Sequence, residues 1–192
     1  MIRNIGCSSS SGVRLLGSFN KLSNMTAPMT QTADTINPYR KFLDGSDPMD
    51  SMRESPTTIA RLIAGASSDD LERAPAPGKW SVREILCHLA DCELSFGVRL
   101  RQGVAEEHHM IQIFDPDVWA KQYDGIPVSD AVNAYTVTRN WNLRFLENVV
   151  PGALERPITH PKRGTMTYRH VIETVAGHDR NHILQIERIL SA

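Results

Sequence analysis

The sequence contains no apolar run of the roughly 18 residues that a membrane-spanning helix needs, so we expect no membrane contact. An excess of one charge is also missing, because 21 basic residues are matched by 22 acidic ones and the net charge is −1. This balance argues against nucleic acid or an anionic membrane surface as a partner. Only three cysteines are present, too few for a disulfide framework, which indicates a reducing compartment such as the cytoplasm.

The first 33 residues lack acidic side chains and any apolar periodicity. They are rich in Ser and Asn and include the low-complexity run Ser8–Ser11. Three interpretations stay open: a disordered tail, a transit peptide for organelle import, or an extension from an upstream start codon. The third is considered because Met25 and Met29 offer later start positions. We predict that residues 1–36 form a disordered extension or targeting segment and that one globular domain covers residues 37–192.

Helical spacing of apolar residues predicts four long helices, and no alternating strand pattern exceeds four residues. The first should run over residues 55–64, with Ser55 as its cap and Pro56 in its first turn, after a short helical turn at 47–53. The second should begin at the capping box Ser81-Val-Arg-Glu84 and end near residue 103.

The third and fourth helices should cover residues 129–149 and 167–190. A long connection at 104–127, with a short helix near 117–122, precedes the third helix, and its length indicates that it crosses over the bundle. Residues 159–164 are predicted to form a loop. The sequence therefore predicts an all-α protein, a four-helix bundle with a long crossover connection.

Two histidines interrupt the buried face of the fourth predicted helix. The stripe Val171, Val175, His178, His182 and Ile189 is apolar at its ends and polar in its middle. Imidazoles buried without partners cost free energy, but residues at i and i+4 point the same way and can bind one metal ion. We therefore predict that His178 and His182 are metal ligands.

A third ligand is expected from a facing helix. His88 is the only histidine of the second helix and borders its packing face. Three neutral imidazoles suit Zn, Ni, Fe or Cu and leave coordination positions open, as in catalytic sites. Cys92, one turn after His88, could close the site as a fourth ligand or could be a small buried hydrophobe.

Two carboxylates near His88 are candidates for acid–base catalysis. Asp91 and Glu84 lie close to its face of the helix, where either could orient an imidazole or move a proton. Both could equally be exposed helix charges, and Glu84 already has a capping role. On the third helix, Arg139 points inward and could bind an anionic substrate group, or it could be a surface side chain.

The remaining polar residues carry weaker signals. His108 and His109 lie in a polar connection and are expected to be solvated, while His160 lies in the predicted loop and could border the site. Gln185 ends the polar part of the buried stripe on the fourth predicted helix and could form a hydrogen bond inside the bundle. Trp80, just before the second helix, is expected to be a packing anchor.

Four blocks of the sequence resemble the DinB-like superfamily, which includes the YfiT-type proteins. The resemblance covers about residues 47–190, and the blocks stand in the order and spacing of the family: Pro75–Glu93, Arg139–Leu143, His160–Thr167 and Gly177–Glu187. The W-S-x-x-E-x-x-x-H-L-x-D-x-E pattern of the family places its first ligand on His88. Its H-x-x-x-H pair falls on His178 and His182.

The resemblance implies a four-helix bundle, often dimeric, with one divalent metal ion on three histidines. It implies a metal-dependent hydrolase, or a transferase that uses a low-molecular-weight thiol, acting on a small molecule. In either reaction the metal would activate water or a thiol. The alternative is a non-catalytic helical bundle in which the metal is structural or the bundle binds a ligand or partner.

Overall fold

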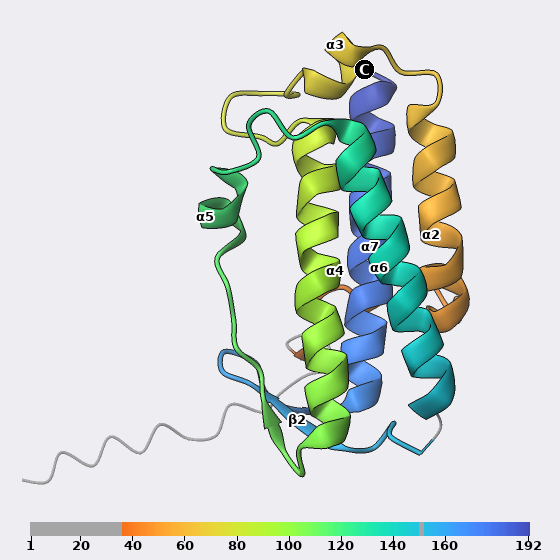
Figure 1. Ribbon diagram of the computed structural model, residues 1–192, viewed down its shortest axis with the longest axis vertical. Coiled ribbons are helices and arrows are strands. Elements are labelled where there is room, and N and C mark those ends of the chain that lie inside the picture. Colours follow the sequence, from red (N-terminus) through yellow and green to blue (C-terminus); the bar gives the residue numbers. More distant parts are fainter. Residues whose placement is uncertain (1–35, 150–151) are drawn as a thin grey trace, which may run out of the picture. The chain divides into compact units, whose positions relative to one another are not determined.

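The computed structural model describes residues 36–149 and 152–192, and four long helices dominate it (Figure 1). This confirms the predicted all-α four-helix bundle. The four helices are α2 (Pro48–Ile63), α4 (Val82–Ala105), α6 (Val128–Val149) and α7 (Tyr168–Leu190). The predicted extension at residues 1–36 lies outside the described residues except for its last residue.

Each helix of the bundle packs against two others. Helices α2 and α4 both contact α6 and α7, so α2 lies diagonally opposite α4 and α6 lies diagonally opposite α7, whereas α4 and α6 are neighbours. Helices α4 and α6 run in the same direction, and the chain between them returns along the length of the bundle (Figure 1). This return is the predicted crossover, and it carries the short helix α5 (Pro116–Ala120).

Helix α2 begins earlier than predicted. The side chain of Asp47 accepts a hydrogen bond from Asp50 N and caps the helix, so Pro56 lies in its interior. A proline there leaves the carbonyl four residues earlier without its helical donor. That carbonyl belongs to Met52, and Arg139 Nη1 from α6 donates to it at 3.2 Å. A tertiary contact therefore compensates the proline, which the local sequence could not indicate.

The loop predicted at 159–164 is only partly right, because residues 161–163 form a turn but the residues on either side belong to a small sheet. Strands β2 (Pro157–His160) and β3 (Gly164–Thr167) form an antiparallel hairpin, and β1 (His109–Met110) pairs with β2 in parallel. The sheet places Ile158 in the core. It also brings the crossover next to the start of α7, since the last residue of β3, Thr167, caps that helix.

Three short elements complete the described part of the chain. They are the 3₁₀ helix η1 (Arg40–Phe42), which packs against α7, the helix α3 (Ser68–Glu72), and α5 in the crossover. Of the helices in residues 36–149 and 152–192, none combines the length and the apolar character that crossing a membrane would require.

Candidate metal centre

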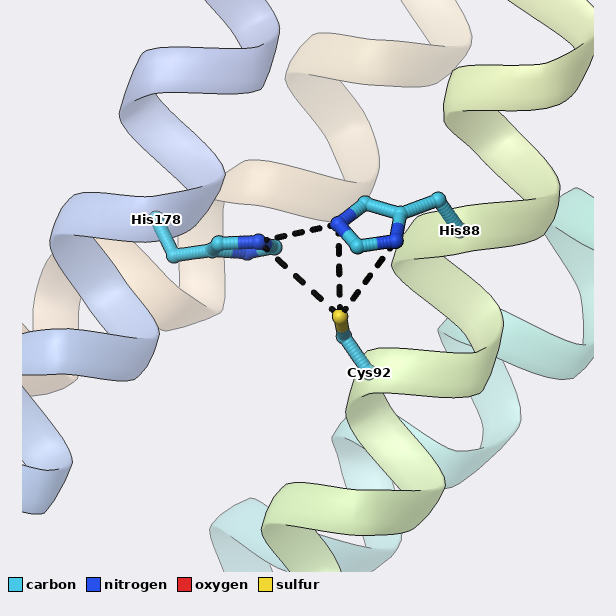
Figure 2. Close-up of side chains that lie close together, drawn as sticks. All are labelled: His88, Cys92 and His178. Atoms are coloured by element: carbon cyan, nitrogen blue, oxygen red, sulfur yellow. Dashed lines mark hydrogen bonds between the residues drawn. The ribbon is translucent and has the colours of Figure 1, made fainter. Parts of the chain in front are cut away.

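Three histidine side chains meet in the interior of the bundle. His88 comes from α4, whereas His178 and His182 lie one turn apart on α7. The Nε2 atom of His178 is 3.1 Å from Nε2 of His88 and 3.2 Å from Nε2 of His182. Figure 2 shows the His88 and His178 rings pointing toward each other across the gap between the two helices. The structure thus brings together all three predicted metal ligands.

These separations fit a single metal ion. Zinc binds imidazole nitrogen at about 2.0–2.1 Å, so two nitrogens of a tetrahedral site lie roughly 3.3 Å apart. The observed 3.1 and 3.2 Å are close to that value. The ring centroids of His88 and His182 are 4.9 Å apart, so the third pair is also in contact.

The environment keeps these imidazoles neutral, as metal ligands must be. Burial, together with the neighbouring His182, lowers the pKa of His88 to about 3. Burial and the adjacent histidines lower the pKa of His178 well below its ordinary value, and burial also lowers that of His182. At neutral pH all three rings therefore have a lone pair available for a metal.

Gln185 fixes the protonation of one ring. Its Oε1 atom lies 3.0 Å from Nδ1 of His182, which therefore carries the proton and donates it to this oxygen. The Nε2 atom of His182 then presents its lone pair to His178. The predicted hydrogen bond of Gln185 inside the bundle thus has a specific role in orienting a candidate ligand.

Cys92 is a further donor at this site, and it forms with His88 and His178 a group whose ligand atoms all lie within 4.8 Å of one another. It lies one turn after His88, and its Sγ is 3.4 Å from Nε2 of His88 and 3.9 Å from Nε2 of His178 (Figure 2). With Zn–S near 2.3 Å, a tetrahedral site would place sulfur roughly 3.6 Å from each nitrogen. Burial strongly raises the pKa of the Cys92 thiol, so without a metal it stays protonated.

A buried charge network holds α4 and α7 together beside the cluster. Arg139 is completely buried and pairs with Glu93, the residue after Cys92, and with Asp179, the residue after His178. Tyr135 also donates to Asp179, at 3.0 Å. Arg139 is therefore neither a surface side chain nor free to bind a substrate. It fixes the two helices that carry the candidate ligands.

A cavity of about 300 Å³ opens onto the cluster. All three histidines and Cys92 line it, together with the Trp80 ring, which lies 4.7 Å from that of His88. Trp80 thus does more than anchor the helix start. The rest of the wall is largely apolar, formed by Phe96, Ile111, Phe114, Met166 and Val171, and the Phe96 ring lies 5.9 Å from that of His178. Arg99, His160 and Arg163 add polar groups to the same cavity.

Tyr39 is a cavity residue that the sequence did not reveal. It precedes η1, and its ring lies 5.2 Å from that of His178 in an edge-on arrangement. The contact depends on Gly177, because a β-carbon there would lie 2.3 Å from the Tyr39 carbonyl oxygen. A helical glycine beside a candidate ligand was the available signal, but its partner lies 138 residues earlier in the chain.

The two predicted catalytic carboxylates do not line this cavity. Glu84 is engaged in the capping box, where its carboxylate accepts from Ser81 N at 2.7 Å. Asp91 accepts from the Tyr123 hydroxyl at 2.8 Å. Their role in proton transfer stays a prediction.

Of the three histidines in the crossover and the hairpin, only His109 differs from expectation. His109 is buried and lies 2.8 Å from Glu106, and exposed His108 contacts Thr159, so only His108 is solvated. His160 lies in a strand and does border the cavity, although not the histidine cluster.

A four-helix bundle with three buried histidines converging beside a cavity defines a helical protein with a candidate metal centre. A sequence model of the DinB superfamily matches residues 51–186, and the chain belongs to this superfamily. That match covers α4 and α6 in full, most of α2 and α7, and all three histidines of the cluster.

Individual relatives agree with this assignment. The chain is 24% identical over 139 residues to a protein of Oceanobacillus iheyensis named a "putative metal-dependent hydrolase", covering 72% of this chain and 81% of that one. A protein of Bacillus mycoides with the same description is 25% identical over 137 residues, covering 70% and 79%. The fold is similar to that of YfiT from Bacillus subtilis, described as "a probable metal-dependent hydrolase with an unusual four-helix bundle topology". That similarity has a TM-score of 0.69 at 17% identity, over 81% of this chain and 95% of that chain.

Proposed function

We propose that this protein is a metal-dependent enzyme that acts on a small molecule, either as a hydrolase or as a transferase using a low-molecular-weight thiol. One divalent ion, Zn, Ni or Fe, would be held by His88, His178 and His182. The observation that carries the proposal is the close approach of His178 Nε2 to Nε2 of both His88 and His182, on the wall of a cavity of about 300 Å³. The names given to the relatives support the same class of reaction.

The residues present supply the parts that such chemistry needs. A divalent ion bound there would act as a Lewis acid and lower the pKa of a bound water or thiol. The Nε2 atom of His178 lies within 3.2 Å of Nε2 of both other histidines, and Gln185 keeps His182 in the required tautomer. The apolar wall formed by Phe96 and Phe114 excludes water from the substrate. Asp91 stays our candidate for proton transfer, with Glu84 the weaker one because it caps the helix.

The compartment proposed for this activity is the cytoplasm. Cys87 and Cys92 are both free thiols in the described part of the chain, as a reducing compartment predicts. A reducing compartment is also where a low-molecular-weight thiol would serve as a co-substrate.

A second candidate function follows from the position of Cys92. Its Sγ lies at a distance suited to a fourth ligand, and a site with four protein ligands is typical of structural zinc. In that case the metal would stabilise the bundle and the cavity would bind a ligand without chemistry. The two functions differ in whether an exogenous ligand can reach the metal.

A substrate screen on matched metal-loaded variants tests the enzymatic proposal. The wild type should turn over a member of an ester, amide or thiol-acceptor panel only with metal bound. His178→Ala should lose both the metal and the turnover. The control is His108→Ala, which alters an exposed histidine that does not line the cavity and should leave both unchanged. Turnover that survives complete metal removal would contradict the proposal.

A further inference from the structure

Two arginines face the same cavity as the histidine cluster. Arg99 comes from α4, seven residues after Cys92, and Arg163 comes from the turn between β2 and β3. Neither side chain has an ion-pair partner among the described residues, in contrast to Arg139. The cavity therefore has a positively charged region that no described carboxylate neutralises.

The Arg99 side chain is arranged to present its charge to a ligand. Its guanidinium lies over the rings of Phe96 and Phe114, at 5.1 and 5.7 Å from their centroids. Its Nε atom is buried and has no hydrogen-bond partner in the described residues, and Nη2 makes only a long contact of 3.4 Å to Gln112 O. A buried donor left without a partner costs free energy, so a ligand that accepts from it would gain affinity.

His160 adds a neutral donor beside the two charges. Its Nδ1 accepts from Lys162 N at 3.1 Å, so the ring proton lies on Nε2, which has no partner among the described residues. Burial and the nearby charges of Arg163 and Arg99 lower the pKa of His160 to about 4, which keeps the ring neutral at pH 7. Burial lowers the pKa of Arg99, and the neighbouring Arg163 lowers it further. Two like charges held together without a counter-ion favour an anionic ligand.

We infer that Arg99, Arg163 and His160 form an oxyanion subsite, so that the substrate is an elongated small molecule with a carboxylate or similar group at one end. The backbones of Cys92 and Arg99 are separated by an axial rise of about 10 Å, so Arg99 reaches into the cavity from about two turns beyond the cysteine. The apolar side chains that line the same cavity accommodate an aliphatic or aromatic segment of the substrate. The inference rests on the proposed function in one respect only, which is that the reacting atom of the substrate lies at the metal.

Paired probes that differ only in charge test the subsite. Hexanoate and hexan-1-ol are compared by calorimetry on the full-length protein, as purified and after metal removal. We expect hexanoate to bind roughly tenfold more tightly or better, since a charge-assisted hydrogen bond supplies at least that difference. Arg99→Met and Arg163→Met should abolish the preference, while Arg99→Lys should keep part of it.

Lys162→Met is the matched control, because it removes a charge from the same turn without altering a residue that lines the cavity. It should keep the full preference for hexanoate. Equal binding of the two probes by the wild type, or a preference that survives in Arg99→Met, would overturn the inference.

A second pair of probes separates this inference from the proposed function. In cobalt-substituted protein, 6-mercaptohexanoate should perturb the cobalt spectrum at lower concentration than 6-mercaptohexan-1-ol. If neither thiol changes the spectrum while hexanoate is still preferred, the oxyanion subsite stands and the open metal site is wrong. If both thiols act at equal concentration, the metal site is open and the subsite is wrong.

Discussion

The Sγ atom of Cys92 lies 3.4 Å from Nε2 of His88, one helical turn away on α4. This distance suits either a fourth metal ligand or a protonated thiol in van der Waals contact with the ring. Burial raises the pKa of the thiol, so coordination would require it to lose a proton that it otherwise keeps. The number of protons released on metal binding therefore distinguishes an open site from a closed one.

We predict that zinc binding at pH 6 releases almost no proton from the protein. The histidines are already neutral there, since the pKa of His88 is about 3, and zinc-bound water with a pKa near 7 stays largely protonated. Calorimetry in buffers of different ionisation enthalpy measures this number. Cys92→Ser should bind zinc with nearly unchanged affinity. Release of about one proton, together with a collapse of affinity in Cys92→Ser, would establish the structural function instead.

Removing Arg139 should strongly destabilise the fold. Arg139→Met leaves Glu93 and Asp179 buried without their counter-charge and Met52 O without a donor, so we expect a loss of about 3–5 kcal/mol in unfolding free energy. Denaturant titration measures the change. Arg144→Met, on the exposed side of the same helix, should change stability by less than about 0.5 kcal/mol. A similar small effect in both variants would show that the network contributes little.

The metal-free protein should lose stability as the pH falls below about 6.5. The pKa of His88 is lowered to about 3 in the folded state, and those of His178 and His182 are lowered too. As the pH falls, the unfolded chain therefore takes up protons before the folded one does. This lowers the free energy of unfolding by up to about 1.4 kcal/mol per pH unit for each histidine. This contribution is fully present above the unfolded pKa of about 6.5 and decreases toward the folded values.

Denaturant titrations between pH 6.5 and 5, above the range where most carboxylates titrate, measure this slope. His88→Gln should make it shallower, and His108→Gln should not. A flat profile in the wild type would contradict the buried neutral state of the cluster.

Gly177→Ala should displace the segment that carries Tyr39. The added β-carbon would lie 2.3 Å from the Tyr39 carbonyl oxygen, so the segment must move or α7 must shift. We expect a loss of roughly 1–3 kcal/mol, as for other overpacked sites, and faster proteolysis near residue 39. Gly65→Ala is the control, because its β-carbon would meet nothing within 4 Å. Equal stability of the two variants would show that the close approach is not needed.

Patterns within single helices were predictable from the sequence, and contacts between elements were not. The polar interruption of the α7 seam at His178 and His182 pointed to the cluster, because helical periodicity fixes which residues share a face. The predicted start of α2 was wrong because Arg139, which is far away in the sequence, supplies the hydrogen bond that Pro56 cannot donate within the helix. The two ion-pair partners of Arg139 could not be predicted either, because no local sequence pattern shows that an arginine is completely buried.

The sheet and the far end of the cavity were missed for a similar reason. Strands β2 and β3 are four residues each, too short for alternation to stand out from a loop. Because the hairpin was not predicted, no pattern in the sequence indicated that Arg163 and His160 lie opposite α4. Arg99 lies within the predicted second helix, but its unpartnered Nε becomes visible only with the neighbouring elements in place.

X-ray absorption of the stoichiometrically metal-loaded protein tests the central claim most directly, because it identifies the atoms bound to the metal. Three histidine ligands predict one ion per chain with nitrogen at about 2.0–2.1 Å and the outer scattering pattern of imidazole rings. His178→Ala should lose that ion, whereas His108→Ala should give the wild-type spectrum. A first shell of oxygen alone, without imidazole scattering, or retention of the same spectrum in His178→Ala, would contradict the assignment of the metal centre.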